Sequence, residues 1–553
     1  MMKWFTPFAA RRLRRAARQY FGWTTLRSGQ LDAMRALYRG KDALVILPTG
    51  GGKSAVYQVP ATLLGPTLVI SPLLALQADQ IAGLNERGDP MLRAVRISSA
   101  ETPRQQEHAL AEIRAGRARF LFITPEQLAK PERLAEVKAL KPALVAVDEA
   151  HCISAWGHEF RPDYLALGHY IRDLGRPPIV ALTATASPPV RDDIIARLGL
   201  KNPTTVISGL DRPNISLAVD YCSTDAARWR SLVTFLKTQG SDRQGIIYVP
   251  TRRAAEELAA KLTGAGFPAE FYHGGLGSGA REERHEEFLA DSAPIMVATS
   301  AFGMGIDKPD IRYVVHMALP DSPDSYQQEI GRAGRDGQPA QALLLWRAED
   351  EALQRYFTGG PPDFSELCQL AVVLREGPTS KTALAKKTGL GVRKLPQLLA
   401  LLEEVGAAAT LANNRIVVPT HAPQPSVAAK AAVAEAERRQ ALQLTRVEMM
   451  RGFAQGTGCR GRKLLAYFGE HAPGDCGHCD NCTAVPRAGA PAPAPAQRGG
   501  EPFAVHSSVR HGDWGIGMVL AYEQDKMTVL FDEVGYKTLS VPVVVGQKLL
   551  VPA

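Results

Sequence analysis

The chain has 553 residues, of which 45% are hydrophobic and 22% are charged, a composition typical of a globular protein with several domains. No apolar run is long enough to cross a bilayer, and the basic N-terminus lacks the apolar segment of a secretory signal, so we expect neither a membrane protein nor a secreted one. The net charge is +9, and residues 1–40 alone hold nine Lys/Arg and one acid. A basic arm fits a polyanionic partner. The alternative is a solvated helix face that carries Arg11, Arg12, Arg14, Arg15 and Arg18.

Residues 21–30 precede the first predicted strand and hold an aromatic ring, a guanidinium and an amide, on Trp23, Arg27 and Gln30. A glutamine side chain can pair with the N6/N7 edge of adenine, and Trp23 and Arg27 are able to stack on the base. In isolation these are ordinary surface residues. Their place just before a phosphate loop favours an adenine site.

That loop runs from Leu47 to Ser54 and follows an apolar run, residues 43–46, which predicts a buried parallel strand. Its three glycines let consecutive backbone N–H groups turn toward one anion. The lysine can reach the β- and γ-phosphates, and the serine can ligate Mg²⁺. Generic phosphate loops have Gly at the first position, where this chain has Leu47. The predicted ATP ligands are Thr49, Gly50, Gly51, Gly52, Lys53 and Ser54.

Further apolar runs at 67–70, 120–123, 144–147 and 179–182 each end in a polar motif, as strands of a doubly wound parallel sheet do. The run at 144–147 leads into Asp148-Glu149-Ala150-His151. Asp148 at a strand end can hold Mg²⁺, and Glu149 can orient and deprotonate the attacking water. We therefore predict Asp148 and Glu149 as catalytic residues.

A second set of predicted strands, at 245–249, 271–272, 295–299 and 313–316, indicates a second lobe of the same type. It is followed by a segment with two arginines three residues apart, Arg332 and Arg335, which share one helix face. An arginine from a second lobe can stabilise charge on a transferring phosphoryl group. The predicted fold class is α/β with two RecA-like lobes, and ATP between them would close them on each other.

These motifs together resemble the RecQ family of superfamily 2 DNA helicases over residues 20–350 and about 430–483. In that superfamily the first glycine of the phosphate loop is often missing, which accounts for Leu47. The resemblance implies an ATP-dependent motor that travels 3′→5′ on single-stranded DNA, unwinds duplex or branched DNA in repair or recombination, and is associated with the nucleoid in the cytoplasm. It implies Arg335 as the arginine finger. Residues 150–164 resemble the family's aromatic-rich loop, which implies that four residues couple DNA binding to hydrolysis: Trp156, His158, Phe160 and Arg161.

Four of the seven cysteines cluster late in the chain, with two residues between each of the last three. Four thiolates so spaced suit a structural, tetrahedral zinc ion, whereas disulfides are the alternative. The surrounding sequence resembles the RecQ zinc subdomain, whose role is mainly stability. The predicted zinc ligands are Cys459, Cys476, Cys479 and Cys482.

The C-terminal part departs from the family pattern. A winged-helix pattern lies before the zinc site, with short helices at 380–387 and 392–404 and a wing at 410–418; a plain helical connector is the alternative. Residues 503–553 have short alternating strands that predict a small SH3- or Tudor-like β-barrel. This pattern resembles the C-terminal barrel of some superfamily 1 repair helicases, which implies docking of a protein partner or nucleic acid.

The predicted domains are lobe 1 at 1–208, lobe 2 at 209–355, the winged helix at 356–420, the zinc subdomain at 421–484, a Pro/Ala-rich linker at 485–502 and the barrel at 503–553.

The sequence therefore predicts a DNA helicase that uses ATP, Mg²⁺ and Zn²⁺, with single-stranded and duplex DNA as partners and no membrane. Two alternatives remain open at this stage. One is an RNA helicase of the DEAH or DEAD type, and the other is a nucleic-acid-binding scaffold with a vestigial ATPase.

Overall fold

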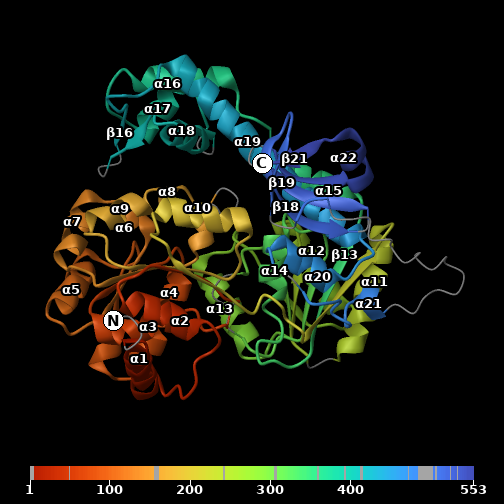
Figure 1. The fold of residues 1–553 in the computed structure, drawn as a ribbon, viewed down its shortest axis with the longest axis horizontal. Helices are drawn as coiled ribbons and strands as arrows, with labels where there is room; N and C mark the ends of the chain where they lie inside the picture. Colours follow the sequence, from red (N-terminus) through yellow and green to blue (C-terminus); the bar gives the residue numbers. More distant parts are fainter. Residues whose placement is uncertain are drawn as a thin grey trace, which may run out of the picture. The chain divides into compact units, whose positions relative to one another are not determined.

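A computed structural model describes residues 5–48, 50–154, 161–240, 243–303, 308–357, 360–391, 394–411, 415–470, 472–483, 502–504, 507–523, 525–531 and 534–553. The chain divides into two compact units. The first joins Met1–Ala352 to Met449–Pro495, and the second joins Leu353–Glu448 to Ala496–Ala553. Each unit is described by itself (Figure 1).

Lobe 1 is built on a seven-stranded sheet in the order β3-β4-β2-β5-β6-β1-β7, and all of its recorded strand pairs are parallel. Strands β1, β2, β4 and β5 are fully buried, as their continuous apolar runs predict. The strands are β1 (Ala43–Ile46), β2 (Thr67–Ile70), β3 (Ala94–Ile97), β4 (Phe120–Ile123), β5 (Leu144–Val147), β6 (Ile179–Thr183) and β7 (Thr204–Ile207).

Helices flank this sheet, and α1, α2 and α3 pack on one another in the red part of Figure 1. The helices are α1 (Phe5–Phe21), α2 (Gln30–Tyr38), α3 (Ala55–Leu64), α4 (Leu74–Asn85), η1 (Pro90–Leu92), α5 (Pro103–Arg114), α6 (Pro125–Leu128), α7 (Pro131–Ala139), η2 (Ala150–Ile153), α8 (Pro162–Leu165), α9 (Leu167–Asp173) and α10 (Pro188–Leu198).

Lobe 2 has a six-stranded parallel sheet in the order β10-β11-β9-β12-β13-β8. Its strands are β8 (Ile215–Tyr221), β9 (Gly245–Tyr248), β10 (Ala269–Tyr272), β11 (Ile295–Ala298), β12 (Tyr313–His316) and β13 (Ala340–Trp346). Its helices are α11 (Asp225–Gln239), α12 (Arg252–Gly264), α13 (Ser278–Leu289), α14 (Pro323–Ile330) and α15 (Glu349–Phe357).

The prediction of two RecA-like lobes is confirmed. Four strands were not predicted, and three of them, β3, β7 and β8, lie at sheet edges. Edge strands carry polar residues such as Arg96 in β3 and Thr204 and Thr205 in β7, so they lack the apolar run that marks a central strand.

The cysteine-rich region follows the long helix α19 (Pro425–Gln455) and contains α20 (Arg460–Tyr467) and α21 (Asp480–Thr483). It packs on the edge strand of lobe 2. Ser216 in β8 donates to His478 O at 2.7 Å, and the backbone N–H of Val219 donates to Asp480 at 2.9 Å. The cysteine-rich region thus covers the open edge of a parallel sheet.

The second unit begins with helices and a small antiparallel sheet in the order β14-β16-β15. Its elements are α16 (Phe364–Leu374), β14 (Thr379–Ser380), α17 (Lys381–Thr388), α18 (Lys394–Glu404), β15 (Ala409–Thr410) and β16 (Arg415–Val417). Leucines of the three helices, including Leu370, Leu384 and Leu399, form its core together with alanines at the start of α19.

The last part of the chain is an antiparallel sheet in the order β20-β19-β18-β17-β21. Its elements are β17 (Ser508–His511), β18 (Gly515–Glu523), β19 (Lys526–Phe531), β20 (Gly535–Ser540), α22 (Val541–Gln547) and β21 (Leu550–Pro552). The sheet is open rather than the closed barrel expected. Within the described ranges its two outer strands do not pair, because the chain passes through α22 after β20 and β21 joins the far edge beside β17.

Candidate nucleotide site and metal centre

The phosphate loop joins β1 to α3 and is shaped by its glycines. Gly50 and Gly52 have positive φ values of 74° and 79°, where only glycine is unstrained. At Gly51 a Cβ would lie 2.7 Å from the Pro48 carbonyl oxygen. Leu47 is buried in the lobe 1 core, so the position that departs from the generic loop serves packing. Thr49 lies outside the described residues.

The predicted adenine residues are brought to this loop. The side-chain amide of Gln30 donates to Gly52 O at 2.9 Å, and its carbonyl oxygen accepts from the backbone N–H of Arg27 at 2.8 Å. The Arg27 guanidinium donates to the Gly50 carbonyl. Trp23 is different, since its ring stacks on Phe21 with centroids 4.5 Å apart and is half-buried. The start of α2 and the loop therefore form one hydrogen-bonded set.

Lys53 and Asp148 lie close enough to affect each other. Lys53 Nζ donates to Leu47 O at 3.2 Å. Burial, together with the neighbouring Glu149, raises the pKa of Asp148 to about 6, while Lys53 acts in the opposite direction. Gln80 donates to Asp148 Oδ2 at 3.3 Å and accepts from the Tyr57 hydroxyl at 2.7 Å. A buried carboxylate beside the loop lysine is a hard oxygen donor of the kind that Mg²⁺ prefers.

Glu149 follows at the tip of the strand with a φ of 47°, a left-handed conformation that is uncommon for residues other than glycine and that clusters at functional sites. Its carboxylate lies 3.3 Å from His151 Nδ1, which is 2.9 Å from the Thr183 hydroxyl at the end of β6. His151 therefore links two strand ends.

The predicted coupling loop is described only at its end. Trp156, His158 and Phe160 lie outside the described residues. Arg161 donates from its guanidinium to Pro72 O at 3.4 Å, in the motif after β2. Tyr164 is buried and donates its hydroxyl proton to Asp148 O at 3.1 Å. The end of the loop thus touches the backbone of the predicted Mg²⁺ ligand.

Arg332 and Arg335 lie in a turn after α14, which ends at Ile330, and not on one helix face as predicted. Their surroundings differ. Arg332 is buried, and its guanidinium lies at the Tyr248 hydroxyl, where it opposes the burial that raises the pKa of that tyrosine. Arg335 reaches lobe 1: a Cβ placed on Gly50 would lie 3.7 Å from Arg335 Cδ. Only Arg335 is therefore placed against the phosphate loop.

The turn that carries Arg332 and Arg335 is held in place by a residue that the sequence did not indicate. Arg212, between β7 and β8, donates to three carbonyl oxygens, those of Gly331 at 3.1 Å and of Ala333 and Gly334 at 2.9 Å. Asn214 adds a bond to Gly334 O at 2.9 Å. No local pattern marks Arg212, because its partners lie about 120 residues away. Gln80 and Tyr57 were missed for the same reason.

The four late cysteines form one cluster. Their sulfur atoms all lie within 4.8 Å of one another, and none of the seven cysteines is in a disulfide. Burial and the neighbouring thiols raise the pKa of Cys482 to about 12. At Cys479 burial is outweighed by hydrogen bonds from the Arg460 backbone and the neighbouring cysteines, which leave the pKa of that thiol lowered. Backbone N–H groups of Arg462 and Cys476 donate to the Cys459 sulfur at 3.4 and 3.1 Å. Four sulfur donors in a closed shell fit structural zinc.

The remaining cysteines are packing residues. Cys152 and Cys222 are buried, and Cys368 packs against the core of the second unit.

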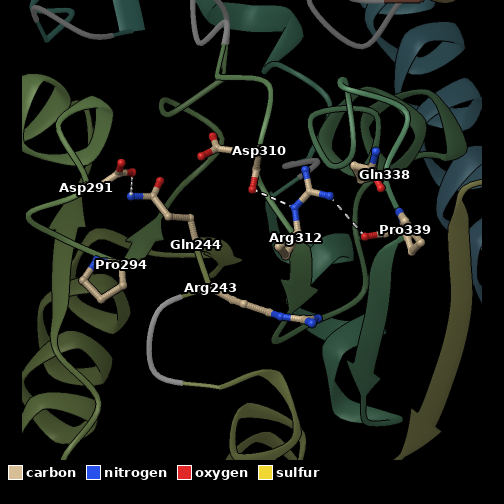
Figure 2. A pocket seen from close by; sticks show the side chains of 8 residues that line it. All are labelled: Arg243, Gln244, Asp291, Pro294, Asp310, Arg312, Gln338 and Pro339. Carbon is tan, nitrogen blue, oxygen red and sulfur yellow. Dashed lines mark hydrogen bonds between the residues drawn. The ribbon is translucent and has the colours of Figure 1, made fainter.

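A pocket of about 680 Å³ lies away from these groups, at the amino ends of the lobe 2 strands (Figure 2). In parallel sheets, ligands bind at the carboxyl ends. Its polar groups are bonded among themselves: Gln244 donates to Asp291 at 2.5 Å, and Arg312 donates to the carbonyl oxygens of Asp310 and Pro339 at 2.8 and 3.3 Å. We assign this pocket no chemistry.

Within the described part of the chain, no helix combines the length and the apolar character that a membrane crossing needs.

Three family matches cover separate parts of the chain. Residues 27–194 match the DEAD/DEAH box helicase family, residues 227–337 match the helicase conserved C-terminal domain, and residues 424–483 match the RecQ zinc-binding family.

Two bacterial relatives cover most of the chain. The probable ATP-dependent DNA helicase RecS of Bacillus subtilis is 36% identical over 477 residues, which are 85% of this chain and 92% of RecS. The ATP-dependent DNA helicase RecQ of the same organism is 34% identical over 84% of this chain and 66% of its own length, so the chain spans about two thirds of that relative.

Among solved structures, Mss116p bound to ssRNA and AMP-PNP has a TM-score of 0.50 at 16% identity, covering 71% of this chain and 89% of that one. This likeness shows the two-lobe fold alone. The names of the sequence relatives favour the predicted DNA helicase over the two alternatives, an RNA helicase and a scaffold with a vestigial ATPase. With a RecQ zinc-binding match and a 36% identity that spans nearly all of RecS, the chain belongs to the RecQ family of ATP-dependent DNA helicases.

Proposed function

We propose that this helicase moves 3′→5′ along single-stranded DNA and opens duplex or branched DNA in repair or recombination by closing its two lobes on ATP. The observation that carries the proposal is Arg335 of lobe 2 against Gly50 of the phosphate loop. A side chain from one lobe at the phosphate site of the other makes closure depend on the nucleotide.

In this scheme the loop glycines and Lys53 bind the phosphates, and Gln30 and Arg27 bind adenine, with Trp23 near the base. Gln30 and Arg27 donate hydrogen bonds to carbonyl oxygens of the phosphate loop. Bound adenine would therefore compete with the loop for these two donors. Glu149 takes a proton from the attacking water. Arg335 stabilises charge on the γ-phosphate, and Arg332 supports the site from within lobe 2.

Ser54 and Asp148 are the groups we assign to Mg²⁺. The donor set fits this ion, because a hydroxyl and a buried carboxylate supply hard oxygen ligands beside the phosphate loop. When bound, the ion neutralises charge on the β- and γ-phosphates. Lys53 shares that task from the side of the protein.

DNA is sensed, we propose, through the loop that holds Trp156, His158 and Phe160. Aromatic side chains stack on unpaired bases at about 1–3 kcal/mol each. The bonds of Arg161 to Pro72 and of Tyr164 to Asp148 give the loop a physical connection to the ATP site. We expect Trp156→Ala to bind DNA but to lose stimulation of hydrolysis by single-stranded DNA; unchanged stimulation would remove this role.

The second unit has the element order of a winged helix, which supports that assignment for residues 356–420. Its α18 is not suited to read DNA, because Lys394 is paired with Glu366 and Glu404 is paired with Arg439.

We propose that the last antiparallel sheet, residues 503–553, docks a protein partner. A reducing, nucleoid-associated location fits the DNA substrate and the free thiols.

The proposal is tested by strand separation on 3′-tailed, 5′-tailed, forked and RNA duplexes with ATP. We expect unwinding of the 3′-tailed and forked DNA, and none of the RNA duplex. Removal of residues 485–553 separates the motor from the C-terminal sheet and should leave the polarity unchanged. Preference for the 5′ tail or for RNA would contradict the proposal.

The phosphate loop is tested by Lys53→Ala, which should abolish DNA-stimulated ATP hydrolysis and unwinding together. The matched control is Lys138→Ala, an exposed lysine of the same lobe, which should leave both intact. Near-normal turnover by Lys53→Ala would refute the role of the phosphate loop.

A further inference from the structure

Helix α1 (Phe5–Phe21) has a buried apolar face and an exposed face that is mostly cationic and also carries Phe8 near its start. One face is buried in the core of lobe 1 and holds Leu13, Ala16, Ala17 and Phe21. The other is exposed and holds only cations and a glutamine in its middle part. The exposed cations are Arg11, Arg12, Arg14, Arg15 and Arg18.

Four of these arginines form one stripe, because positions 11, 14, 15 and 18 are spaced i, i+3, i+4 and i+7 and lie on one helix face. The helix contains no acidic residue. Within the described ranges no ion pair is recorded for these four arginines. Like charges at this spacing destabilise a helix, so the stripe carries a charge that its own element does not neutralise.

Neighbouring groups extend the positive surface rather than compensate it. Arg12 lies over the Tyr38 ring, 5.7 Å from its centroid. Two exposed cations, Arg39 and Lys41, follow Tyr38 directly. The one acid of residues 1–40, Asp32, pairs with Arg35 at 3.4 Å. The end of α2 therefore adds positive charge next to the middle of α1.

We propose that the exposed stripe of α1 binds the phosphate backbone of DNA, at a contact separate from the motor motifs. The stripe is about 10 Å long at 1.5 Å per residue, roughly three phosphates of one strand. All four cations are arginines, whose fork binds phosphate in two-pronged fashion. The contact is independent of sequence, since it reaches no base edge.

A membrane surface is disfavoured by the packing of the same helix. Amphipathic helices bind bilayers by burying their apolar face among lipids. The apolar face of α1 is already occupied, with Leu13 and Ala17 fully buried in the core. The exposed side of α1 offers a partner several guanidinium groups and a single aromatic ring, Phe8, which lies beside Arg12. So small an apolar area suits a polyanion such as DNA better than a bilayer.

The test replaces all four stripe arginines by glutamine in the full-length protein. Glutamine has a helix propensity close to that of arginine, so folding should be retained. The matched control removes four exposed cations elsewhere on lobe 1, at Arg104, Arg114, Lys138 and Lys141. Both variants lose the same net charge.

DNA affinity is measured by fluorescence anisotropy over a range of salt concentrations. Each phosphate contact contributes about 0.7 to 0.9 to the slope of log K against log salt. We expect the stripe variant to lose about 2 to 3 from the slope and roughly 10- to 100-fold in affinity at low salt. The control should change little, and the ATPase kcat at saturating DNA should stay within about twofold of wild type, because the nucleotide site is untouched.

An unchanged slope, or an equal loss in the control variant, would overturn the proposal. So would loss of binding to anionic lipid vesicles with DNA affinity retained, which would make lipid the partner. Arg14→Gln with Arg18→Gln gives a milder variant, expected to lose about half of the slope change. Replacement of all four by lysine keeps the charge and should keep most of the slope.

Discussion

In lobe 1 two catalytic candidates follow strands: Lys53 lies in the loop between β1 and α3, and Asp148 comes directly after β5. In lobe 2 the candidate residue Arg335 stands in a turn after α14, and the turn is held by Arg212 from the segment that joins the lobes. Lobe 1 therefore builds its phosphate loop and its Asp148-Glu149 pair from adjacent residues. Lobe 2 builds its contribution from residues far apart in the chain.

The difference follows from what each lobe has to do. A phosphate loop must present several backbone N–H groups at once, so its residues have to be adjacent. An arginine that crosses to another lobe needs a fixed backbone from which its side chain can extend. Hydrogen bonds from a distant guanidinium to three carbonyl oxygens supply that fixed backbone.

The difference between the two lobes predicts that the largest loss of ATPase activity follows substitution of Arg335. We expect Arg335→Ala to lower DNA-stimulated kcat by about a thousandfold or more, because an arginine at the transferring phosphate contributes 10³–10⁵ in related chemistry. Steady-state ATPase assays with saturating DNA measure it. Arg253→Ala, an exposed arginine of the same lobe, is the control. A loss below about tenfold would mean that lobe 2 contributes binding rather than catalysis.

The next largest effect is expected at the zinc centre, because the cysteine-rich region covers an edge of the lobe 2 sheet. Cys479→Ser should remove about one zinc per chain and destabilise lobe 2 more than lobe 1, since β8 loses the support of His478 and Asp480. Metal analysis and thermal unfolding measure both effects. Cys368→Ser, which changes a cysteine outside the cluster, should keep the zinc. Full zinc content in Cys479→Ser would show that this thiol is not a ligand.

Arg212 tests whether the lobe 2 turn is positioned from a distance. We expect Arg212→Ala to lower kcat by roughly 100-fold, the cost of a small misplacement of a catalytic group. The double variant with Arg335→Ala should be no slower than Arg335→Ala alone, because both changes act through one side chain. Multiplied losses in the double variant would instead show that Arg212 supports the fold in general.

The smallest effect is expected at Asp42, which stabilises lobe 1 without touching the nucleotide. Its carboxylate accepts from Arg176 at 2.6 and 3.0 Å and from the backbone N–H groups of Ile179 and Lys201. We expect Asp42→Asn to lower the free energy of unfolding by about 2 kcal/mol at neutral pH, with ATP turnover unchanged at moderate temperature.

The pH dependence of that effect has a definite sign. Burial alone would raise the pKa of Asp42, but the bonds from Arg176, Lys201 and Ile179 outweigh it and leave the pKa lowered. The stabilisation is therefore present above the unfolded value near 4 and is lost as the pH falls through the folded value. Denaturant unfolding should show the difference between wild type and Asp42→Asn shrinking below about pH 4. A constant difference would contradict this account.

The sequence by itself determined the motor. Buried parallel strands require continuous apolar runs, and phosphate loops require adjacent glycines, so β1 with Lys53 and β5 with Asp148 could be predicted from local pattern alone. The spacing of Cys459, Cys476, Cys479 and Cys482 indicated the metal centre in the same way.

Only the tertiary structure decided which side chains support these motifs. The contacts of Gln80 with Asp148, of Tyr164 with the Asp148 carbonyl and of Arg212 with the arginine turn join residues 16 to about 120 positions apart. The edge strands and the open C-terminal sheet were missed for a related reason. Pairing at a sheet edge depends on which segments meet in space, and no local period of the sequence records that choice.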